Sequence, residues 1–373
     1  MRIGEVLVSR PSFIFPRAPG FAEAEGIRRF ECHDIVARSG VISADRILLQ
    51  NYPIAHPISA FNASVIYDEE DEELKLYARI VHGYYMYVSS IAEVRVPIGD
   101  VFNRYVNANR YAGRIVIHPS NKYDIWGTED PRAYRISGKP YMTYAGRSIN
   151  YFNPYIRVNR TLPIMAAYDR ETRSWVKRCV LTLSPDVFGD PISNKDSFLH
   201  MAGNKTLFFF HRPHLSDESF RLMISRLNAE EVLAEGGELR EVRVDNCVEV
   251  LGNAPFEGRI GWATPPIDLD RDRVIALIHS VDKDMVVYRV FAAQLLLKRD
   301  EILVEAVTPS YIMEPKTPYE MIGDRPLVVF PCGMVKVKEK GVLITYGAAD
   351  YMIGIGLICL DDLLAELDRG RIY

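Results

Sequence analysis

The sequence lacks the features that mark nucleic-acid-binding and membrane-spanning proteins. It has 373 residues and a formal net charge of −4, and its lysines and arginines form no run that would contact a phosphate backbone. No apolar stretch is long enough to cross a bilayer. We therefore expect neither a nucleic acid nor a membrane as a partner.

Cysteine is also scarce. The five cysteines are odd in number, widely scattered and without paired metal-ligand spacing: Cys32, Cys179, Cys247, Cys332 and Cys359. The first 19 residues carry charges and prolines where a secretory signal needs an apolar core. We therefore expect a cytoplasmic protein with reduced thiols and no required metal.

What the sequence does contain is a pattern that occurs five times: an apolar strand, a tight polar turn, and a second apolar strand with a polar end. The copies cover residues 64–79, 133–147, 198–212, 266–279 and 333–350, with turns at residues 70–71, 138, 203–204, 270–272 and 340–341. Successive turn centres are about 66 to 69 residues apart, a regularity not expected of unrelated hairpins. The strands are rich in Val, Ile, Leu, Tyr and Phe, as half-buried strands are.

Each repeat is long enough for a four-stranded blade, so the pattern predicts an all-β protein, a five-bladed β-propeller. The alternative is a two-sheet sandwich or two smaller β domains, which the even spacing disfavours. Leucine spacing predicts short peripheral helices at residues 229–235 and 360–369. Because residues 1–48 do not match the repeat, we expect them to form an N-terminal arm or a strand that closes the ring. Residues 49–373 are then expected to form a single propeller domain.

Unusual polar residues occur at two positions of the repeat. Before the turns lie Asn62, Asp130, Lys195, Thr264 and residues 331–333, and after the turns lie Arg79, Arg147, His211, Arg212, His279, Tyr346 and Asp350. Equal phase in a ring means equal radius and height, so we expect these side chains to meet at one end of the central channel. A carboxylate among several cations predicts a pocket for a phosphate-like anion.

Each of these residues also has a purely structural interpretation. Asp130 precedes Pro131 and can cap a turn, while Lys195 can be a solvated loop lysine. His211 and His279 follow apolar strands, where histidines are usually hydrogen-bonded core residues. Only the shared phase favours a functional interpretation.

The polar residues belong to motifs that resemble, in order, those of glycoside hydrolase family 130, the β-mannoside phosphorylases and related hydrolases. The resemblance covers nearly the whole chain after residue 50. The motifs are Asn51-Tyr52-Pro53-Ile54, Phe61-Asn62-Ala63, Leu76-Tyr77-Ala78-Arg79, Gly127-Thr128-Glu129-Asp130-Pro131-Arg132, Asn194-Lys195-Asp196, His211-Arg212-Pro213, Gly261 with Thr264-Pro265-Pro266-Ile267, Val329-Phe330-Pro331-Cys332-Gly333 and Tyr346-Gly347-Ala348-Ala349-Asp350.

The resemblance implies a five-bladed propeller and an inverting phosphorylase that yields α-mannose 1-phosphate. It makes Asp130 the general acid, acting through the 3-hydroxyl of mannose, with inorganic phosphate as co-substrate and no cofactor. It implies that Arg147, Lys195 and His211 bind phosphate and that Asn62, Arg79 and Asp350 bind mannose. The other motif residues expected around the carbohydrate are Glu129, Arg132, Arg212, Thr264, His279 and Tyr346. Since members of this family often form oligomers, the resemblance also allows a homo-oligomer.

The chain departs from the family pattern at residues 148–163, which look inserted. The family's second phosphate arginine therefore has four candidates, Arg157, Arg160, Lys177 and Arg178. Because hydrolytic members of the family activate water with acidic groups, a β-mannosidase that uses Asp169 or Glu171 as its base is the second hypothesis. A non-catalytic sugar-binding propeller is the third. The motifs leave the linkage, 1,2 or 1,4, open.

Overall fold

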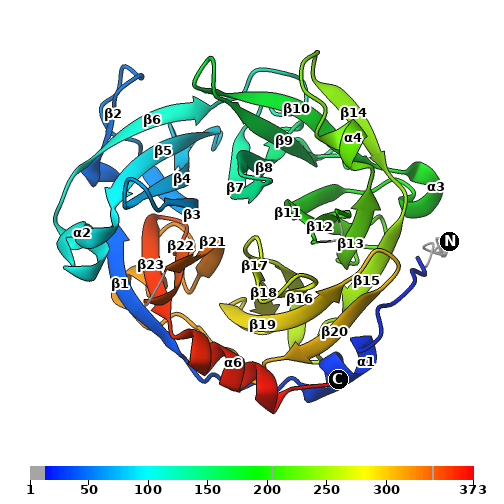
Figure 1. Ribbon diagram of the computed structural model, residues 1–373. Helices are drawn as coiled ribbons and strands as arrows, with labels where there is room; N and C mark the ends of the chain where they lie inside the picture. Colours follow the sequence, from blue (N-terminus) through cyan, green and yellow to red (C-terminus); the bar gives the residue numbers. More distant parts are fainter. Residues whose placement is uncertain (1–12, 204, 338–339) are drawn as a thin grey trace, which may run out of the picture.

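Five β-sheets follow one another around a central axis in the computed structural model, which describes residues 13–203, 205–337 and 340–373 (Figure 1). This arrangement confirms the predicted five-bladed β-propeller. Sequential hairpins build each blade, so the chain passes from the central channel outward and then enters the next blade. Of the predicted turn residues, Asn204 lies outside the described residues.

Each blade extends from an innermost strand at the channel to an outermost strand at the rim. In this order, blade 1 contains β3 (Ser59–Asp68), β4 (Glu73–Val81), β5 (Ser89–Pro97), β6 (Tyr111–Ile117) and β2 (Ile47–Leu49). Blade 2 contains β7 (Thr128–Ile136), β8 (Lys139–Arg147), β9 (Thr161–Asp169), β10 (Ser174–Leu183) and β14 (Arg240–Val244). Blade 3 contains β11 (Ser193–Met201), β12 (Leu207–His214), β13 (Leu222–Leu227) and β15 (Cys247–Leu251).

Blades 4 and 5 complete the ring. In blade 4, β16 (Glu257–Trp262) and β17 (Ile267–Asp268) both pair with β18 (Arg273–Asp282), followed by β19 (Tyr288–Leu297) and β20 (Ile302–Val307). Blade 5 contains β21 (Val329–Val337), β22 (Gly341–Ala348), β23 (Met352–Ile358) and β1 (Val36–Ile42).

The N-terminal segment contributes strands to two blades. β1 pairs antiparallel with β23, so the outermost strand of the last blade comes from the start of the chain, and β2 pairs parallel with β6. The division into an arm of residues 1–48 and a domain of residues 49–373 stays a prediction, and residues 1–12 lie outside the described residues.

The helices labelled in Figure 1 lie at the periphery of the ring. The described helices are α1 (Phe21–Ile27), α2 (Ile98–Phe102), α3 (Pro185–Phe188), α4 (Ala229–Val232), α5 (Pro318–Met321) and α6 (Leu360–Arg369), with 3₁₀ turns at Ala44–Arg46 and Tyr105–Asn107. α6 matches its predicted range, and α4 is shorter than the predicted 229–235. None of the helices in the described part of the chain is long and apolar enough to span a membrane.

The same irregularity interrupts the innermost strand of several blades. In β3, β7 and β11 the pairing register shifts by a bulge just after Phe61, Glu129 and Lys195. The next residue of each strand is Asn62, Asp130 or Asp196, with φ of 47°, 50° and 51°. A β-bulge adds one residue to the strand and turns its side chain, so two consecutive residues can face the same side. The three bulges therefore reorient the polar side chains of these residues, which lie at the same height in the central channel.

Apolar side chains between neighbouring blades hold this framework. Between blades 3 and 4, the rings of Phe210 and Trp262 are 4.9 Å apart and nearly perpendicular, and both side chains are fully buried. Trp262 also donates a hydrogen bond from Nε1 to the carbonyl of Met223, at 3.0 Å. Close-packed interiors of this kind allow little movement of the backbone that carries the polar residues.

Candidate active site

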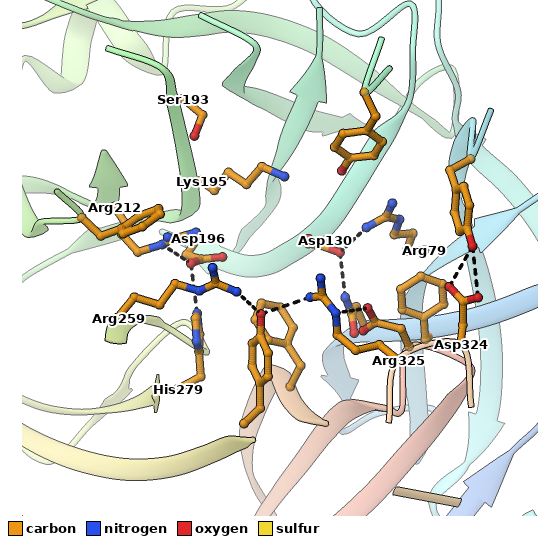
Figure 2. Close-up of a pocket in the computed structure, with 18 of the residues that line it drawn as sticks. Arg79, Asp130, Ser193, Lys195, Asp196, Arg212, Arg259, His279, Asp324 and Arg325 are labelled. Atoms are coloured by element: carbon orange, nitrogen blue, oxygen red, sulfur yellow. Dashed lines mark hydrogen bonds and ion pairs between the residues drawn. The ribbon is translucent and has the colours of Figure 1, made fainter. Parts of the chain in front are cut away.

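A pocket of about 610 Å³ takes side chains from all five blades (Figure 2). Seven of the residues expected from the sequence line it: Asn62, Arg79, Asp130, Lys195, Arg212, His279 and Asp350. The other wall residues are Phe61, Tyr87, Tyr151, Phe152, Ser193, Asp196, Phe220, Arg259, Tyr288, Asp324, Arg325 and Phe330. A pocket lined by aromatic rings and charged groups suits a carbohydrate and an anion.

Asp130 is fixed by two donors from blade 1. Its Oδ1 accepts hydrogen bonds from Asn62 Nδ2 at 2.8 Å and from Arg79 Nη1 at 3.1 Å. Gly347 keeps room for Asn62, because a Cβ at residue 347 would lie 1.7 Å from Asn62 Oδ1. The carboxyl group of Asp130 therefore has one oxygen bound to the protein and a defined orientation in the pocket.

Beneath this group, Glu129 is fully buried among three cations. Its carboxylate accepts hydrogen bonds from Arg79 Nη2 at 2.9 Å, Arg147 Nη1 at 3.1 Å and Lys195 Nζ at 3.1 Å. Burial alone would raise the pKa of Glu129, but Arg79, Lys195 and Arg147 outweigh it and hold that pKa below its ordinary value. Burial likewise disfavours the charge of Lys195, yet Glu129 raises the lysine's pKa overall. Glu129 is therefore ionised and Lys195 protonated at neutral pH.

Tyr151 covers this cluster. Its hydroxyl donates to both oxygens of Glu129, at 2.8 and 2.9 Å, and its ring centre lies 3.1 Å from the guanidinium carbon of Arg147. Arg147 is fully buried, and its Nε and Nη2 have no hydrogen-bond partner among the described residues. Arg147 thus lies directly behind Tyr151 rather than on the pocket wall.

Tyr151 belongs to residues 148–160, which connect β8 to β9 without forming a strand. Arg160 holds this connection by donating to the carbonyls of Asn150, Tyr151, Asn153 and Ile156, at 2.8–3.0 Å. The segment that the sequence marks as inserted is therefore held by Arg160, and it delivers two side chains to the pocket, those of Tyr151 and Phe152.

A second charged cluster forms around Asp196. Its Oδ2 accepts from Arg212 Nε at 2.6 Å and lies 2.9 Å from His279 Nε2. Although burial favours the protonated acid, Arg212 and His279 hold the pKa of Asp196 below its ordinary value. Gly261 leaves space for the pair, since a Cβ there would lie 2.3 Å from His279 Nε2. Arg132 is buried behind this cluster and donates to the carbonyl of Asp130 at 2.7 Å.

Asp350 is a pocket carboxylate with a raised pKa. Burial raises its pKa to about 6, and the negative charge of Asp130 adds to the effect, while Arg325 and Arg79 oppose it. Its Oδ2 is 3.9 Å from Arg325 Nε. The charge of Asp350 therefore changes close to neutral pH.

The structure does not bring His211 to the pocket. Adjacent residues of a regular strand point to opposite faces. Arg212 lies opposite Lys195 in the β11–β12 pairing and faces the pocket with it, so His211 faces the other way. His211 Nε2 lies 2.9 Å from Ser225 Oγ, and its ring stacks on Phe209. Burial lowers its pKa to about 3, so it is neutral and offers no charge to a phosphate.

Two further expected residues also lie away from the pocket wall. Tyr346 is fully buried and donates to Glu320 Oε1 at 2.7 Å. Thr264 is fully buried, and its hydroxyl has no partner among the described residues. Neither residue lines the cavity.

None of the four candidates for a second phosphate arginine lines the pocket. Arg157 pairs with Glu218, Arg160 supports the loop it belongs to, and Lys177 pairs with Asp124. Arg178 is only partly buried and also lies off the pocket wall. The pocket instead contains Arg259 and Arg325, which the sequence reasoning missed.

The pocket residues that the sequence did not predict differ in whether a pattern in the sequence pointed to them. Asp196 follows Asn62 and Asp130 at the same repeat spacing, a signal that was present but assigned to its neighbour Lys195. Arg259 lies two residues before Gly261, which is the first residue of a family motif. Tyr151 lies in the β8–β9 connection and Arg325 in the connection before β21, both outside the strands that carry the repeat, so the repeat could not reveal them.

No metal site emerges from the described ranges, in which no three His, Cys, Asp or Glu side chains are grouped as ligands. All five cysteines are free thiols.

Comparisons with known proteins agree on one family. The family model for glycoside hydrolase family 130, described as beta-1,4-mannooligosaccharide phosphorylase, matches residues 26–369. A beta-1,2-mannobiose phosphorylase of Thermoanaerobacter sp. (strain X514) is 27% identical over 329 residues, which cover 83% of this chain and 96% of that protein. A 1,2-beta-oligomannan phosphorylase of the same organism is 24% identical, over 82% of this chain and 91% of that protein.

Solved structures share the fold. A beta-1,2-mannobiose phosphorylase from Listeria innocua, in complex with beta-1,2-mannobiose, superposes with a TM-score of 0.65 at 18% identity, over 89% of this chain and 99% of that one. A mannose phosphorylase from Leishmania mexicana, in complex with a phosphate ion, gives a TM-score of 0.57 at 14% identity, over 94% of both chains.

Proposed function

The chain belongs to glycoside hydrolase family 130, and on this premise we propose that it is an inverting phosphorylase that cleaves a β-mannoside with inorganic phosphate. The products are α-mannose 1-phosphate and the shortened sugar, and the reaction also runs in the synthetic direction. The linkage is 1,2 or 1,4, since the family description gives 1,4 and the two curated relatives are named for 1,2.

The observation that carries the proposal is the setting of Asp130. One oxygen of its carboxyl group is bound by Asn62 and Arg79, which leaves the other available to a proton and a substrate hydroxyl. A general acid must be held within hydrogen-bond reach of the group it protonates. We assign Asp130 as this acid, which protonates the leaving oxygen through the 3-hydroxyl of mannose.

Phosphate then attacks the anomeric carbon from the opposite side of the sugar. Because phosphate is already an anion, it needs positioning and charge neutralisation rather than a base. Lys195, protonated and on the pocket wall, supports a phosphate site, and Arg147 joins it when Tyr151 moves from its face. The proposal gives no phosphate contact to His211.

The remaining pocket residues are assigned to the carbohydrate. Asn62, Arg79 and Asp350 line the part of the pocket next to Asp130 and bind the mannose that receives the phosphate. Arg212 and His279 orient Asp196 toward the same cavity. Glu129, Arg132 and Tyr346 act from behind as positioning residues, since they hold other groups rather than line the pocket. Thr264 is given no contact with the carbohydrate.

Dependence on phosphate tests the proposal. The purified protein is incubated with β-1,2- and β-1,4-mannobiose, with and without phosphate, and free mannose and α-mannose 1-phosphate are measured. We expect mannose 1-phosphate in an amount equal to the free mannose released, and no cleavage without phosphate. Equal cleavage rates in both conditions would refute phosphorolysis.

Asp350 supports a second candidate function, hydrolysis. A carboxylate with a pKa of about 6 can act as a base that activates water near neutral pH. Asp169 and Glu171, the bases expected from the sequence, do not fit this role, since Asp169 ends β9, Glu171 lies in the β9–β10 turn, and neither is on the pocket wall. The phosphate-dependence experiment separates the two functions, and inactivity toward every mannoside in both conditions would favour a non-catalytic sugar-binding propeller.

Two broader assignments belong to the same proposal. The free cysteines support a cytoplasmic protein, in which thiols stay reduced. The sugar and phosphate are its partners, and a homo-oligomer is proposed from the family alone.

A further inference from the structure

Two arginines that no motif identified meet in the pocket. Arg259, from β16, and Arg325, from the connection before β21, both donate a hydrogen bond to the hydroxyl oxygen of Tyr288, with an Arg325 Nη1 to Oη distance of 3.1 Å (Figure 2). The guanidinium carbon of each lies 5.7 Å from the centre of the Tyr288 ring. One phenol therefore holds two cations side by side.

The charge of this pair is poorly balanced by the protein. Arg259 has no ion pair with any described carboxylate, and the nearest carboxylate oxygen to Arg325 belongs to Asp350, at 3.9 Å from Nε. The other carboxylates of the pocket have partners of their own, since Asp196 is bound by Arg212 and Asp324 accepts from Tyr87 at 3.0 Å. Each guanidinium carries five N–H donors, so most donors of the pair remain for a ligand.

Adjacent positive charges repel each other, and an anion bound between them offsets this repulsion. Planar guanidinium groups match the geometry of carboxylate and phosphate, which they bind with two parallel hydrogen bonds. Arg259 and Arg325 therefore have the chemistry of an anion subsite, distinct from the Lys195 and Arg147 cluster on the blade 2 and blade 3 side.

The place of the pair in the pocket indicates which anion it receives. In an inverting displacement the nucleophile and the leaving group lie on opposite sides of the sugar. Resting on the proposed function, with phosphate at Lys195, the blade 4 and blade 5 side receives the leaving sugar. The Arg325 side chain is 53% exposed, as expected where that sugar extends toward solvent.

We propose that Arg259 and Arg325 form an anion subsite for a carboxylate or phosphate group carried by the leaving sugar, so that the preferred substrates are acidic β-mannosides. In the synthetic direction, an acidic sugar is then the better acceptor of mannose from α-mannose 1-phosphate.

The experiment compares matched neutral and acidic acceptors. Phosphate release from α-mannose 1-phosphate is measured with mannose, mannuronate and mannose 6-phosphate, and with glucose, glucuronate and glucose 6-phosphate. We expect kcat/KM for an acidic acceptor to exceed that of its neutral counterpart by about tenfold or more, the size of one charge-assisted hydrogen bond. In the Arg259→Gln and Arg325→Gln variants, the ratio of kcat/KM for an acidic acceptor to kcat/KM for its neutral counterpart should fall toward one.

Two controls accompany these variants. Arg157→Gln removes an arginine paired with Glu218 outside the pocket and should keep the acidic preference. Thermal melting establishes that each variant is folded, and Arg325→Gln, at an exposed position, carries the test if Arg259→Gln does not fold. Arg259→Lys keeps the charge without the planar fork and should retain part of the preference.

Several results would overturn the inference. Equal use of neutral and acidic acceptors by the wild-type protein, or an acidic preference that survives both substitutions, would do so. A rise in the KM for phosphate during cleavage of neutral mannobiose, without any change in acceptor preference, would instead place the co-substrate at the pair. Absence of activity with every acceptor and every mannoside would be a failure of the proposed function itself.

Discussion

The side-chain amide of Asn62 donates a hydrogen bond to the carboxyl group of Asp130 at 2.8 Å, and the two residues occupy the same left-handed bulge position in neighbouring blades. A repeated backbone irregularity thus supplies both the proposed acid and the group that orients it. Since both backbones are held in sheets, the contact does not depend on a flexible loop.

The first prediction concerns Asp130→Asn. The variant keeps the shape of the side chain but cannot donate a proton of suitable acidity, so we expect kcat/KM for a β-mannoside to fall roughly 10³-fold. Phosphorolysis rates and the melting temperature are measured together. A folded variant with unchanged turnover would remove Asp130 from the mechanism.

The second prediction concerns Glu129→Gln. The substitution leaves Arg79, Arg147 and Lys195 together without their shared carboxylate, and breaking a buried ion pair from one side typically costs about 3–5 kcal/mol. The free energy of unfolding is measured with urea. Glu218→Gln, which breaks the contacts of a partly exposed carboxylate with Arg157 and His214, is the control and should cost less than about 1 kcal/mol.

The difference in unfolding free energy between the wild type and Glu129→Gln should depend on pH in a defined direction. The pKa of Glu129 is lowered in the folded state from its ordinary value of 4.5, so the unfolded chain binds a proton more readily. The stability from this charge is complete above pH 4.5 and is lost as the pH falls further. The gap between wild type and Glu129→Gln should therefore narrow below pH 4.5, and a constant gap down to pH 2 would contradict the assigned charge.

Asp350 leads to the third prediction, on the pH profile of kcat/KM. Burial raises its pKa to about 6, so Asp350 is protonated below that pH and ionised above it. If its ionised form accepts hydrogen bonds from mannose hydroxyls, activity should fall on the acidic side with a midpoint near pH 6. The Asp350→Asn variant should lack this limb, and a limb that persists unchanged in the variant belongs to another group.

The fourth prediction contrasts Lys195 and His211 as phosphate ligands. Lys195 is protonated and lines the pocket, whereas His211 is neutral and bonded to Ser225 outside it. Lys195→Met should raise the KM for phosphate by about tenfold or more. His211→Asn should leave that KM unchanged and lower the melting temperature. Initial rates at varied phosphate decide between the two, and a raised KM in His211→Asn would contradict the observed geometry.

These predictions separate the features of the fold and the site that could be predicted from the sequence from those that could not. Repeat spacing revealed the blades because each one buries the same apolar hairpin, and it placed Asn62 and Asp130 together because their bulges recur. It could not separate His211 from Arg212, since the side that a residue faces depends on the strand register around a bulge. Arg325 and Tyr151 lie in connections of individual shape, where no periodicity constrains a side chain.

Tyr151 carries the last prediction, because its ring lies over the guanidinium group of Arg147. Phosphate can contact Arg147 only after Tyr151 leaves, and leaving breaks its hydrogen bonds to Glu129 and its contact with the cation. Tyr151→Ala should therefore lower the KM for phosphate several-fold, and Tyr151→Phe, which loses only the hydrogen bonds, should have a smaller effect. Phe152→Ala changes the next pocket residue of the same segment and serves as the control. A higher KM for phosphate in Tyr151→Ala would mean that the phenol binds phosphate itself. The double variant of Tyr151→Ala and Arg147→Gln separates the two explanations, because the lower KM expected for Tyr151→Ala requires Arg147.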